Sequence, residues 1–500
     1  MRSKNTLYNV LMNLILQIVT IIYGFIVPKI IIEQFGSNVN GLITSITQFL
    51  AYITLLESGF GPVVKSLLYK PIAQKNNNEI ANILYKSEVF FKKITMIFIL
   101  YVALLCVFYP FLINNEFSYI FTFSLIIIIS ISTLVEYYFG MTYRLFLQAN
   151  QKNYIISIVQ TITYLLNIVI IILLAKLNVS IHLIKLISCL VFIFRPVFLN
   201  IYVKRKYSIS FDNINKDYKI KNQWDGLVQH IASVIHGNTD ITLLSIFSTL
   251  SEVSVYSVYM LIVNGLKQVI QIFSNGIDAM FGDMIAKNED EKLNKNFNLY
   301  EILFYSISTI IFTVAIVLIV PFVSIYTTGI NDANYIRYTF GYLIVISEYI
   351  WAIRLPYSSI TLAAGHFKET KKGAWIECIV NLTLSILLVL KFGIIGVTIG
   401  TIVSMFIRTI EFMYHTNKYI LKRSMFYSLK KVLFIIIESI LIIFIYNFIP
   451  LLEYTSYLNW CINAVLISCI SILVVFFITI LFFKEECQEI KQLLKKVIKR

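Results

Sequence analysis

The sequence has few charged residues. Only 14% of its 500 residues are Asp, Glu, Lys or Arg, about half of the roughly 25% that is usual in soluble domains. The apolar set makes up 58%, and the mean hydropathy is +0.78. This composition excludes a soluble enzyme and a disordered chain. It also excludes a nucleic-acid binder, although the net charge is +15. We therefore expect a polytopic membrane protein.

Cysteine patterns and catalytic signatures are also missing. The six cysteines form no C-x-x-C spacing and five lie in apolar runs, so we expect buried side chains and neither disulfides nor a metal site. No phosphate-binding loop, zinc-protease motif, nucleophile elbow or dinucleotide fingerprint occurs. The sequence predicts no cofactor, no metal and no catalytic residues, so any active transport draws on an ion gradient, the membrane potential or the supply of substrate.

Long apolar runs fill the chain instead. A spanning helix takes about 20 apolar residues. Short polar breaks separate the runs, which predicts an all-α fold with about 14 transmembrane helices. The predicted spans are residues 7–32, 39–66, 89–113, 119–145, 154–175, 181–203, 223–247, 253–281, 299–325, 337–363, 373–391, 393–417, 431–450 and 457–483. The connecting loops are too short to fold into a domain, so the function is expected within the membrane.

Basic residues lie almost entirely on one side of these spans. The N-terminus, the even-numbered loops and the tail hold 33 Lys and Arg, whereas the opposite side has four near span ends. Such a bias predicts that both termini are cytoplasmic. The first run is too long for a signal-peptide core and lacks a small-residue cleavage site, so we expect it to remain as a span. The tail, residues 484–500, is either a basic amphipathic helix on the inner leaflet or a solvated segment.

Local patterns recur about 211–217 residues later in the chain. Pro110-Phe111 matches Pro321-Phe322, Asn167 matches Asn381, and Arg195 matches Arg408. Each unit holds an even number of spans, which predicts two parallel six-helix repeats with substrate between them. The predicted organisation is an N-terminal lobe (1–203), a cytoplasmic linker (204–222), a C-terminal lobe (223–417), two extra helices (431–483) and the tail.

Polar side chains form stripes on several spans at helical spacing. A stripe lines either a polar cavity or a packed helix interface, where such side chains hydrogen-bond across helices. The candidates for binding a polar, sugar-like substrate are Asn9, Asn13 and Gln17 in the first span, Gln229 and Ser233 in the seventh, and Asn264, Gln271 and Asn275 in the eighth.

Charged side chains deep in a span are costly unless they face water or a partner. The cations Lys267 and Arg354 are candidates for binding an anion such as a diphosphate, and Lys29 and Lys65 near span ends are added to them. The carboxylates are candidates for ion coupling, and they are Glu57, Asp240, Asp278 and Glu348. Glu348 and Arg354 are six residues apart, so each is expected to pair elsewhere. Arg144, Arg195 and Arg408 are nearer span ends and are expected to extend to the interface.

Five local patterns resemble one transporter superfamily. They are Pro28 followed by Gly36 and Gly41, L-L-E-S-G-F-G-P at 55–62, Asp240 followed by V-S-V-Y-S at 253–257, A-A-G-H-F-K-E-T at 363–370, and K-F-G-I-I-G-V-T-I-G-T at 391–401. In their order and spacing the chain resembles the multidrug/oligosaccharidyl-lipid/polysaccharide (MOP) exporters, and within them the polysaccharide biosynthesis (Wzx-type) flippases.

The resemblance implies two six-helix lobes with MATE-like folds around a cavity that faces alternately in and out. It implies a bacterial cytoplasmic-membrane flippase for undecaprenyl-diphosphate-linked oligosaccharide in capsule, O-antigen or teichoic-type polymer export. The implied partners are this substrate, membrane lipids and the polymerase or ligase machinery, with a monomer as the transporting unit. Two alternatives stay open: a cation-coupled drug antiporter and a lipid II flippase. The first span lacks the acidic residue usual in drug exporters, and the first two spans lack the several arginines usual in lipid II flippases.

Overall fold

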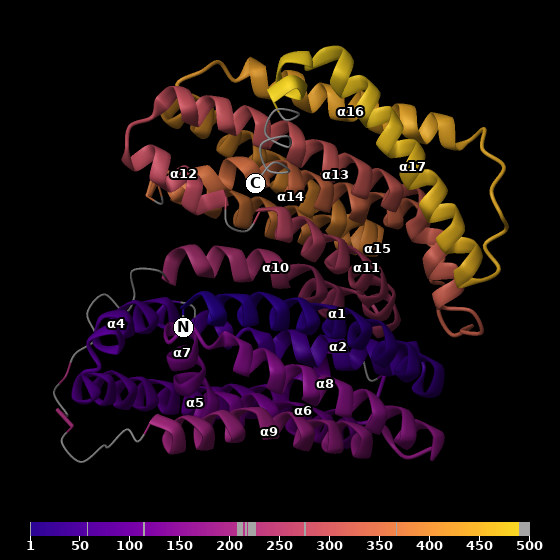
Figure 1. The fold of residues 1–500 in the computed structure, drawn as a ribbon. Helices are drawn as coiled ribbons and strands as arrows, with labels where there is room; N and C mark the ends of the chain where they lie inside the picture. The colour runs from indigo at the N-terminus through magenta and orange to yellow at the C-terminus, as the bar shows by residue number, and fades with distance from the viewer. Residues whose placement is uncertain are drawn as a thin grey trace. The chain divides into compact units, whose positions relative to one another are not determined.

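The computed structural model describes residues 2–57, 59–113, 116–207, 214–215, 218, 227–274, 277–366 and 368–489. Helices account for all regular structure in this part of the chain, as the sequence predicted. The chain divides into two compact units, Met1–Ser254 and Val255–Arg500, which are drawn in Figure 1. The predicted lobe boundary at 204–222 stays a prediction.

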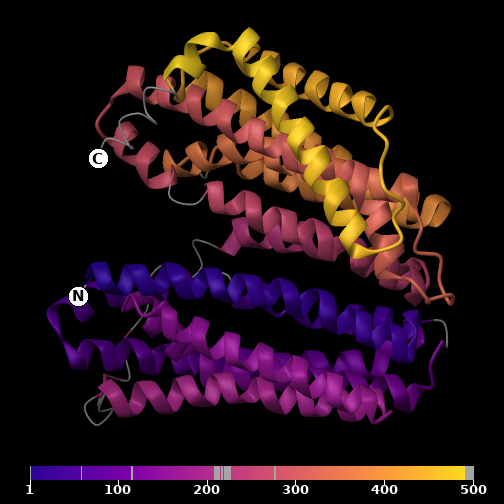
Figure 2. The same cartoon turned by 45° about the vertical axis from the view of Figure 1, so that its right-hand side comes forward.

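The first unit contains ten α-helices, one short π-helix and the first turn of an eleventh α-helix in the described ranges. They are α1 (Arg2–Phe35), α2 (Ser37–Ala51), α3 (Thr54–Glu57), α4 (Phe60–Gln74), α5 (Asn77–Leu112), α6 (Tyr119–Val135), the π-helix η1 (Glu136–Gly140), α7 (Met141–Ala149), α8 (Asn153–Lys176), α9 (Ile181–Tyr207), α10 (Leu227–Phe247) and the start of α11 (Leu250–Ser274). Helix α1 packs along α8, and α6 packs against both α5 and α9 (Figures 1 and 2).

The second unit holds the rest of α11 and the helices that follow it. They are α12 (Ile277–Ala286), α13 (Asp290–Tyr326), α14 (Tyr338–Ala363), α15 (Lys371–His415), the π-helix η2 (Thr416–Ile420), α16 (Phe426–Tyr446) and α17 (Tyr457–Phe482). Helix α13 is central, because it packs against α14, α16 and α17 (Figure 2).

Polar residues in the predicted loops begin several of these helices. The side chains of Asn76, Ser118 and Ser456 accept hydrogen bonds from backbone N–H groups in the first turns of α5, α6 and α17, at 3.2, 3.4 and 3.2 Å. Such caps satisfy N–H groups that have no partner within the helix. Helices α6 and α17 begin at the predicted residues, whereas α5 begins at Asn77, twelve residues before the predicted span at 89, because its first turns extend beyond the apolar run.

Ten helical segments among the described residues are long and apolar enough to span a membrane. Their outer faces carry large apolar side chains such as Leu100, Ile120 and Leu177, with exposed fractions of 64%, 77% and 71%. Contiguous apolar surface of this kind is typical of a face that contacts lipid. The protein is therefore a multi-pass membrane protein. Cys461 and Cys469 are exposed on α17, so the expectation of burial was wrong for both.

Helix α15 contains two predicted spans that fold back on each other. Gly393 has φ +52° and ψ −129°, outside the helical region, a conformation that favours glycine. Asn381 donates a 3.1 Å hydrogen bond to Thr401 across the fold. In the first unit Ser188 donates a 2.9 Å hydrogen bond to Asn167. These two contacts join residues at matching positions of the predicted repeat.

The second predicted span, 39–66, is not one continuous helix. Turns at residues 52–53 and at Gly59 divide it into α2, α3 and α4. The predicted span is thus interrupted, and its part Ser37–Glu57 is long and apolar enough to cross a membrane. Hydropathy does not detect a backbone break within an apolar segment. The interruption leaves Glu57 at the end of the short helix α3.

Candidate functional site

Lys267 of α11 pairs with a carboxylate of α14. Lys267 Nζ lies 2.8 Å from Glu348 Oε2, and the two side chains are 24% and 5% exposed. Lys267 Nζ is also 4.8 Å from the ring centroid of Trp351, a distance at which a cation is attracted to the ring face. Two residues proposed from the sequence for different roles are thus one ion pair.

Arg354 pairs with a carboxylate that the sequence analysis did not select. Its Nη1 lies 2.7 Å from Glu377 Oε1, and the side chains are 14% and 11% exposed. Glu377 also lies 3.5 Å from Arg408 Nε, and Arg408 is paired with Glu411 in addition. This neutral cluster of two arginines and two glutamates joins α14 to both halves of α15.

The position of Arg408 differs from the expectation. The sequence suggested that Arg408 extends to the membrane interface, but the residue is 7% exposed and donates a 2.8 Å hydrogen bond to the backbone oxygen of Thr370. The fold of α15 back on itself at Gly393 brings Glu377 beside it, and Glu411 lies three residues further along the same half of the helix. The distance of a residue from the end of its span does not reveal which carboxylates will lie beside it in the folded protein.

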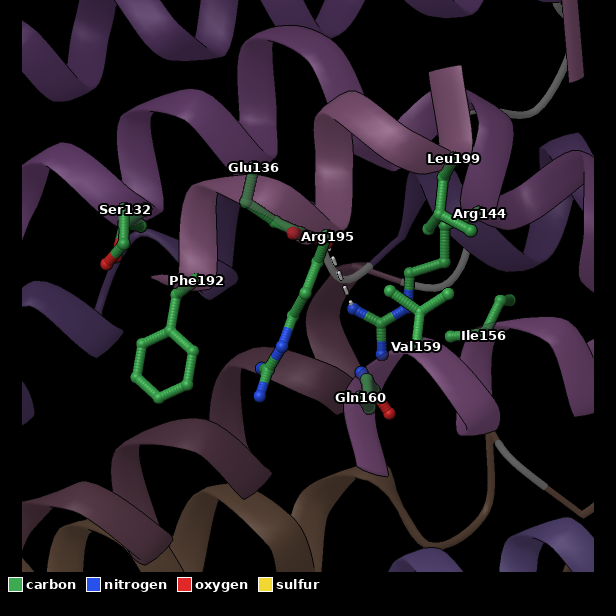
Figure 3. A pocket seen from close by; sticks show the side chains of 10 residues that line it. Ser132, Glu136, Arg144, Ile156, Val159, Gln160, Phe192, Arg195 and Leu199 are labelled. Atoms are coloured by element: carbon green, nitrogen blue, oxygen red, sulfur yellow. Dashed lines mark ion pairs between the residues drawn. The ribbon is translucent and has the colours of Figure 1, made fainter. Parts of the chain in front are cut away.

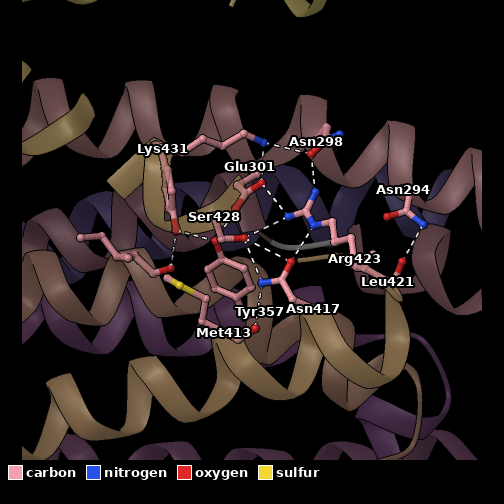
Figure 4. Close-up of polar contacts among 12 residues, drawn as sticks. Asn294, Asn298, Glu301, Tyr357, Met413, Asn417, Leu421, Arg423, Ser428 and Lys431 are labelled. Atoms are coloured by element: carbon pink, nitrogen blue, oxygen red, sulfur yellow. Dashed lines mark hydrogen bonds and ion pairs between the residues drawn. The ribbon is translucent and has the colours of Figure 1, made fainter. Parts of the chain in front are cut away.

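A second buried network was missed by the sequence analysis. Glu301 on α13 is fully buried and lies 2.6 Å from Lys431 Nζ and 3.1 Å from Arg423 Nη2. Tyr357 also donates a hydrogen bond to it, and Asn298 accepts one from Lys431 at 3.0 Å. Figure 4 shows both cations converging on the carboxylate. The network joins α13 and α14 to the start of α16, so its role is to hold the fold together.

We expect Glu301→Gln to lower the free energy of unfolding by about 3–5 kcal/mol, because it leaves two cations without an anionic partner in a buried site. Denaturant titration in mixed micelles measures the change. The matched control is Glu289→Gln, which removes a carboxylate from an exposed 2.9 Å pair with Lys292 and is expected to cost less than about 1 kcal/mol. Equal losses for the two variants would contradict the proposed role of the network.

In the first unit, Glu57 and Lys65 line a common pocket. The pocket has a volume of about 370 Å³, and Glu136, Tyr137 and Arg144 also line it. Tyr137 donates a 2.8 Å hydrogen bond to Glu57 Oε2. The structure thus brings two sequence-selected residues into a cavity with mixed charges between α3, α4, η1 and α7.

The other candidates of the first unit are distributed along α1. Lys29 pairs with Glu33 at 2.9 Å. Asn9 donates to the backbone oxygen of Gln151 at 3.0 Å, and Asn13 accepts from Asn153 at 3.0 Å. These bonds attach α1 to the start of α8, which is the packing role that the sequence left open. Gln17 is half-buried on α1.

The remaining candidates lie on α10, α11 and α12. Asn264 and Gln271 are exposed on α11, and Asp240 is 8% exposed on α10. The side chains of Gln229, Ser233 and Asp278 and the whole of Asn275 lie outside the described residues. Within the parts that the structure describes, no three His, Cys, Asp or Glu side chains are grouped as metal ligands would be.

An apolar groove runs between α13 and α17. It has a volume of about 670 Å³ and is lined mainly by aliphatic and aromatic side chains, including Leu303, Ile310, Ile472 and Phe476, with Lys484 near one end. The groove lies on helices whose outer faces are apolar. Its lining therefore favours contact with hydrocarbon chains over contact with water.

Comparison with solved structures identifies the fold. The chain is similar to the lipid II flippase MurJ in an inward closed conformation, with a TM-score of 0.71, 15% identity and coverage of 95% of this chain and 99% of that one. It is similar to an inward-facing multidrug resistance MATE transporter of the MOP superfamily, with a TM-score of 0.61, 14% identity and coverage of 82% and 94%. No family model and no curated protein matches the sequence.

A third similar structure is a MOP superfamily transporter from Pyrococcus furiosus described as having a binding pocket of reverse polarity. Its TM-score is 0.58, with 13% identity and coverage of 85% of this chain and 97% of that one. Identities at this level establish the architecture and leave function open. The chain therefore has the fold of the MOP superfamily of transporters and flippases, in agreement with the resemblance found in its sequence patterns.

Proposed function

We propose that the protein is a flippase of the bacterial cytoplasmic membrane, and not an enzyme. It moves an undecaprenyl-diphosphate-linked oligosaccharide from the inner to the outer leaflet by alternating access, for capsule, O-antigen or teichoic-type polymer export. Both termini are cytoplasmic, as the 33 basic residues on one side indicate. The observation that carries the proposal is the groove between α13 and α17, because it suits a lipid chain better than a small soluble drug.

The walls of the groove support a lipid substrate. Ile302, Leu303 and Ile310 of α13 face Ile472, Val475 and Phe476 of α17 across it. A polyprenyl chain in contact with these side chains exchanges one apolar environment for another, so its removal from bulk lipid costs little. Lys484 at the predicted cytoplasmic end provides a cation where the diphosphate would enter from the inner leaflet.

The buried ion pairs of the second unit support an anionic headgroup. Lys267 and Arg354 are only partly exposed, and each has a carboxylate partner within 3 Å. A diphosphate oxygen competes with that carboxylate for the cation, and Arg binds such oxygens through two parallel hydrogen bonds. In the first unit, Lys29 and Lys65 are the residues that we propose for binding the diphosphate. Glu57, Asp240, Asp278 and Glu348 remain the candidates for ion coupling. The polar side chains listed for the stripes are the candidates for sugar contacts.

We expect Ile472→Trp to reduce flipping of the lipid-linked oligosaccharide at least tenfold, because an indole ring fills the groove that the polyprenyl chain occupies. Leu473→Trp is the matched control, since Leu473 is the next residue on α17, is 66% exposed and does not line the groove. Both variants are measured in proteoliposomes after equal reconstitution. Equal flipping by the two variants would remove the groove from the transport path.

A lipid II flippase is the second candidate, and the similarity to MurJ over 95% of the chain favours it. The groove does not discriminate between the two, because both substrates carry a polyprenyl diphosphate. A competition experiment discriminates between the two. If lipid II is the natural cargo, unlabelled lipid II blocks flipping of the labelled substrate. If the first proposal is correct, an unlabelled lipid-linked oligosaccharide without peptide blocks it instead.

A further inference from the structure

A second polar pocket lies in the first unit beside the pocket of Glu57 and Lys65, with which it shares Glu136 and Arg144. It has a volume of about 220 Å³ and lies between α6, η1, α7, α8 and α9. The polar side chains that line it are Ser132, Thr133, Glu136, Arg144, Gln160 and Arg195. Figure 3 shows the guanidinium groups of Arg144 and Arg195 reaching into the same space. Both arginines were expected at the membrane interface, and the structure places them here instead.

The π-helix brings these groups together. Glu136 begins η1, and Gly140 ends it. A Cβ atom at Gly140 would lie 2.6 Å from the Cβ of Pro196, so glycine is needed for α9 to approach this closely. The approach places Arg195 beside the pocket, with its guanidinium carbon 4.3 and 4.4 Å from the ring centroids of Tyr164 and Phe192. Short π-helical segments of this kind are frequent at functional sites.

Arg195 has unused hydrogen-bonding capacity. Its Nε donates to Thr163 Oγ1, but its Nη2 is buried and forms no hydrogen bond with any part of the protein that the structure describes. A buried donor without a partner costs about 1–3 kcal/mol, and more when it is charged. Arg144 Nη1 lies 3.6 Å from Glu136 Oε1.

The internal repeat shows what is missing at Arg195. Its counterpart Arg408 is paired with Glu377 and Glu411. The positions equivalent to these two glutamates in the first repeat, 214 and 213 residues earlier, are Thr163 and Phe198. The second repeat thus neutralises its arginine internally, whereas the first repeat replaces both carboxylates by uncharged residues and has a pocket at the same place.

We infer that this pocket binds a singly charged phosphoryl group, either a free phosphate ion or one phosphoryl of a lipid headgroup. Two arginines and one glutamate give the pocket a net charge of +1, which suits one negative charge. Ser132, Thr133 and Gln160 add hydrogen-bond donors for several oxygen atoms. The volume is below the roughly 300–1,000 Å³ of pockets for drug-sized ligands, so it accommodates a phosphoryl group and no sugar chain. The inference does not depend on the proposed transport activity.

The test measures binding to the full-length protein in nanodiscs of zwitterionic lipid. One arm follows radiolabelled inorganic phosphate at constant ionic strength, and the other follows polyprenyl phosphate placed in the nanodisc without free phosphate. Arg195→Gln removes the cation, and Thr163→Glu keeps the cation but installs the carboxylate found in the second repeat. We expect each variant to bind at least tenfold more weakly than the wild-type protein, because a charge-assisted hydrogen bond is lost.

The control is Lys70→Gln, which removes one exposed positive charge from α4 outside the pocket and is expected to bind as the wild type does. Two different variants guard against a folding defect in one of them, and size-exclusion profiles report on folding independently. A loss in the first arm identifies free phosphate as the ligand, and a loss confined to the second arm identifies a lipid headgroup. Unchanged binding of both probes by both variants, or no binding by the wild type, overturns the inference.

Discussion

Cross-linking Asn40→Cys to Ser254→Cys with a short thiol reagent is expected to abolish transport. In the wild-type protein Asn40 Nδ2 donates a 2.8 Å hydrogen bond to Ser254 Oγ. Tyr52, which follows α2, and Thr242 on α10 are also joined by a 2.8 Å hydrogen bond. Asn40 and Ser254 are 214 residues apart, which equals the offset of the predicted repeat. Asn40 belongs to the predicted N-terminal lobe and Ser254 to the predicted C-terminal lobe, so this hydrogen bond links the two predicted repeats.

Alternating access requires the two repeats to separate on one side of the membrane at a time. The predicted topology places both ends of this contact on the outer side, so it has to open before substrate is released there. A covalent link prevents that opening, and flipping in proteoliposomes is expected to fall to the background rate and to recover when a cleavable linker is reduced. The variants are made in a background without the six native cysteines.

The control for this experiment links two helices that are expected to stay together. Ser124 and His182 form a 2.9 Å hydrogen bond between α6 and α9, which pack along each other and both belong to the predicted N-terminal lobe, 1–203. Ser124→Cys linked to His182→Cys is expected to keep more than half of the wild-type rate. Full transport by the Asn40–Ser254 cross-linked protein would show that this contact does not open during the cycle.

Arg354→Gln is expected to slow flipping about 100-fold per folded protein. It is also expected to lower stability, because it leaves two glutamates with one arginine in a buried cluster. In the proposed cycle a diphosphate oxygen takes the place of Glu377 beside Arg354, and Glu377 keeps Arg408 as its partner at 3.5 Å. The exchange leaves no charge unpaired, because the diphosphate supplies the negative charge beside Arg354. The lost rate corresponds to one bidentate, charge-assisted contact of roughly 3 kcal/mol.

Two further variants separate charge from geometry at this position. Arg354→Lys keeps the charge but loses the planar fork, so an intermediate rate is expected. Lys391→Gln removes an exposed cation from α15 and is expected to leave the rate unchanged. Initial rates with a fluorescent lipid-linked oligosaccharide provide the measurement. A wild-type rate for Arg354→Gln would exclude Arg354 from the diphosphate site.

The sequence predicted the helices well because composition determines them. Apolar runs mark where the helices lie, whereas caps such as Asn76, which begins α5 twelve residues before the predicted span, were recognised only in the structure. The matched pairs Asn167 with Ser188 and Asn381 with Thr401 show that weak similarities at a constant offset reflected real spatial equivalence. The separation of Glu348 from Arg354 was also anticipated, since residues six apart point in different directions on a helix.

The partners of the buried charges were not predictable in the same way. Lys267 and Glu348 are 81 residues apart in the sequence and lie on different helices. Hydropathy contains no information about which helices pack together. The sequence analysis counted Arg423 and Lys431 among the basic residues of a cytoplasmic loop. In the structure both side chains are largely buried and paired with Glu301. The π-helix at Glu136–Gly140 lies against Pro196 of α9, a tertiary contact that the sequence did not reveal. Long-range packing therefore determines which charged residues meet at each site, whereas the local sequence determines where the helices form.

The most direct test of the proposed function is a leaflet-accessibility assay. Fluorescent undecaprenyl-diphosphate oligosaccharide is reconstituted with the purified protein in proteoliposomes, and a membrane-impermeant quencher reports the fraction in the outer leaflet over time. The flippase proposal predicts rapid, protein-dependent loss of the protected fraction, slowed by Ile472→Trp and not by Leu473→Trp. No translocation of any polyprenyl-linked glycan or of lipid II, together with proton- or sodium-driven efflux of small cations, would contradict it and identify a drug antiporter instead.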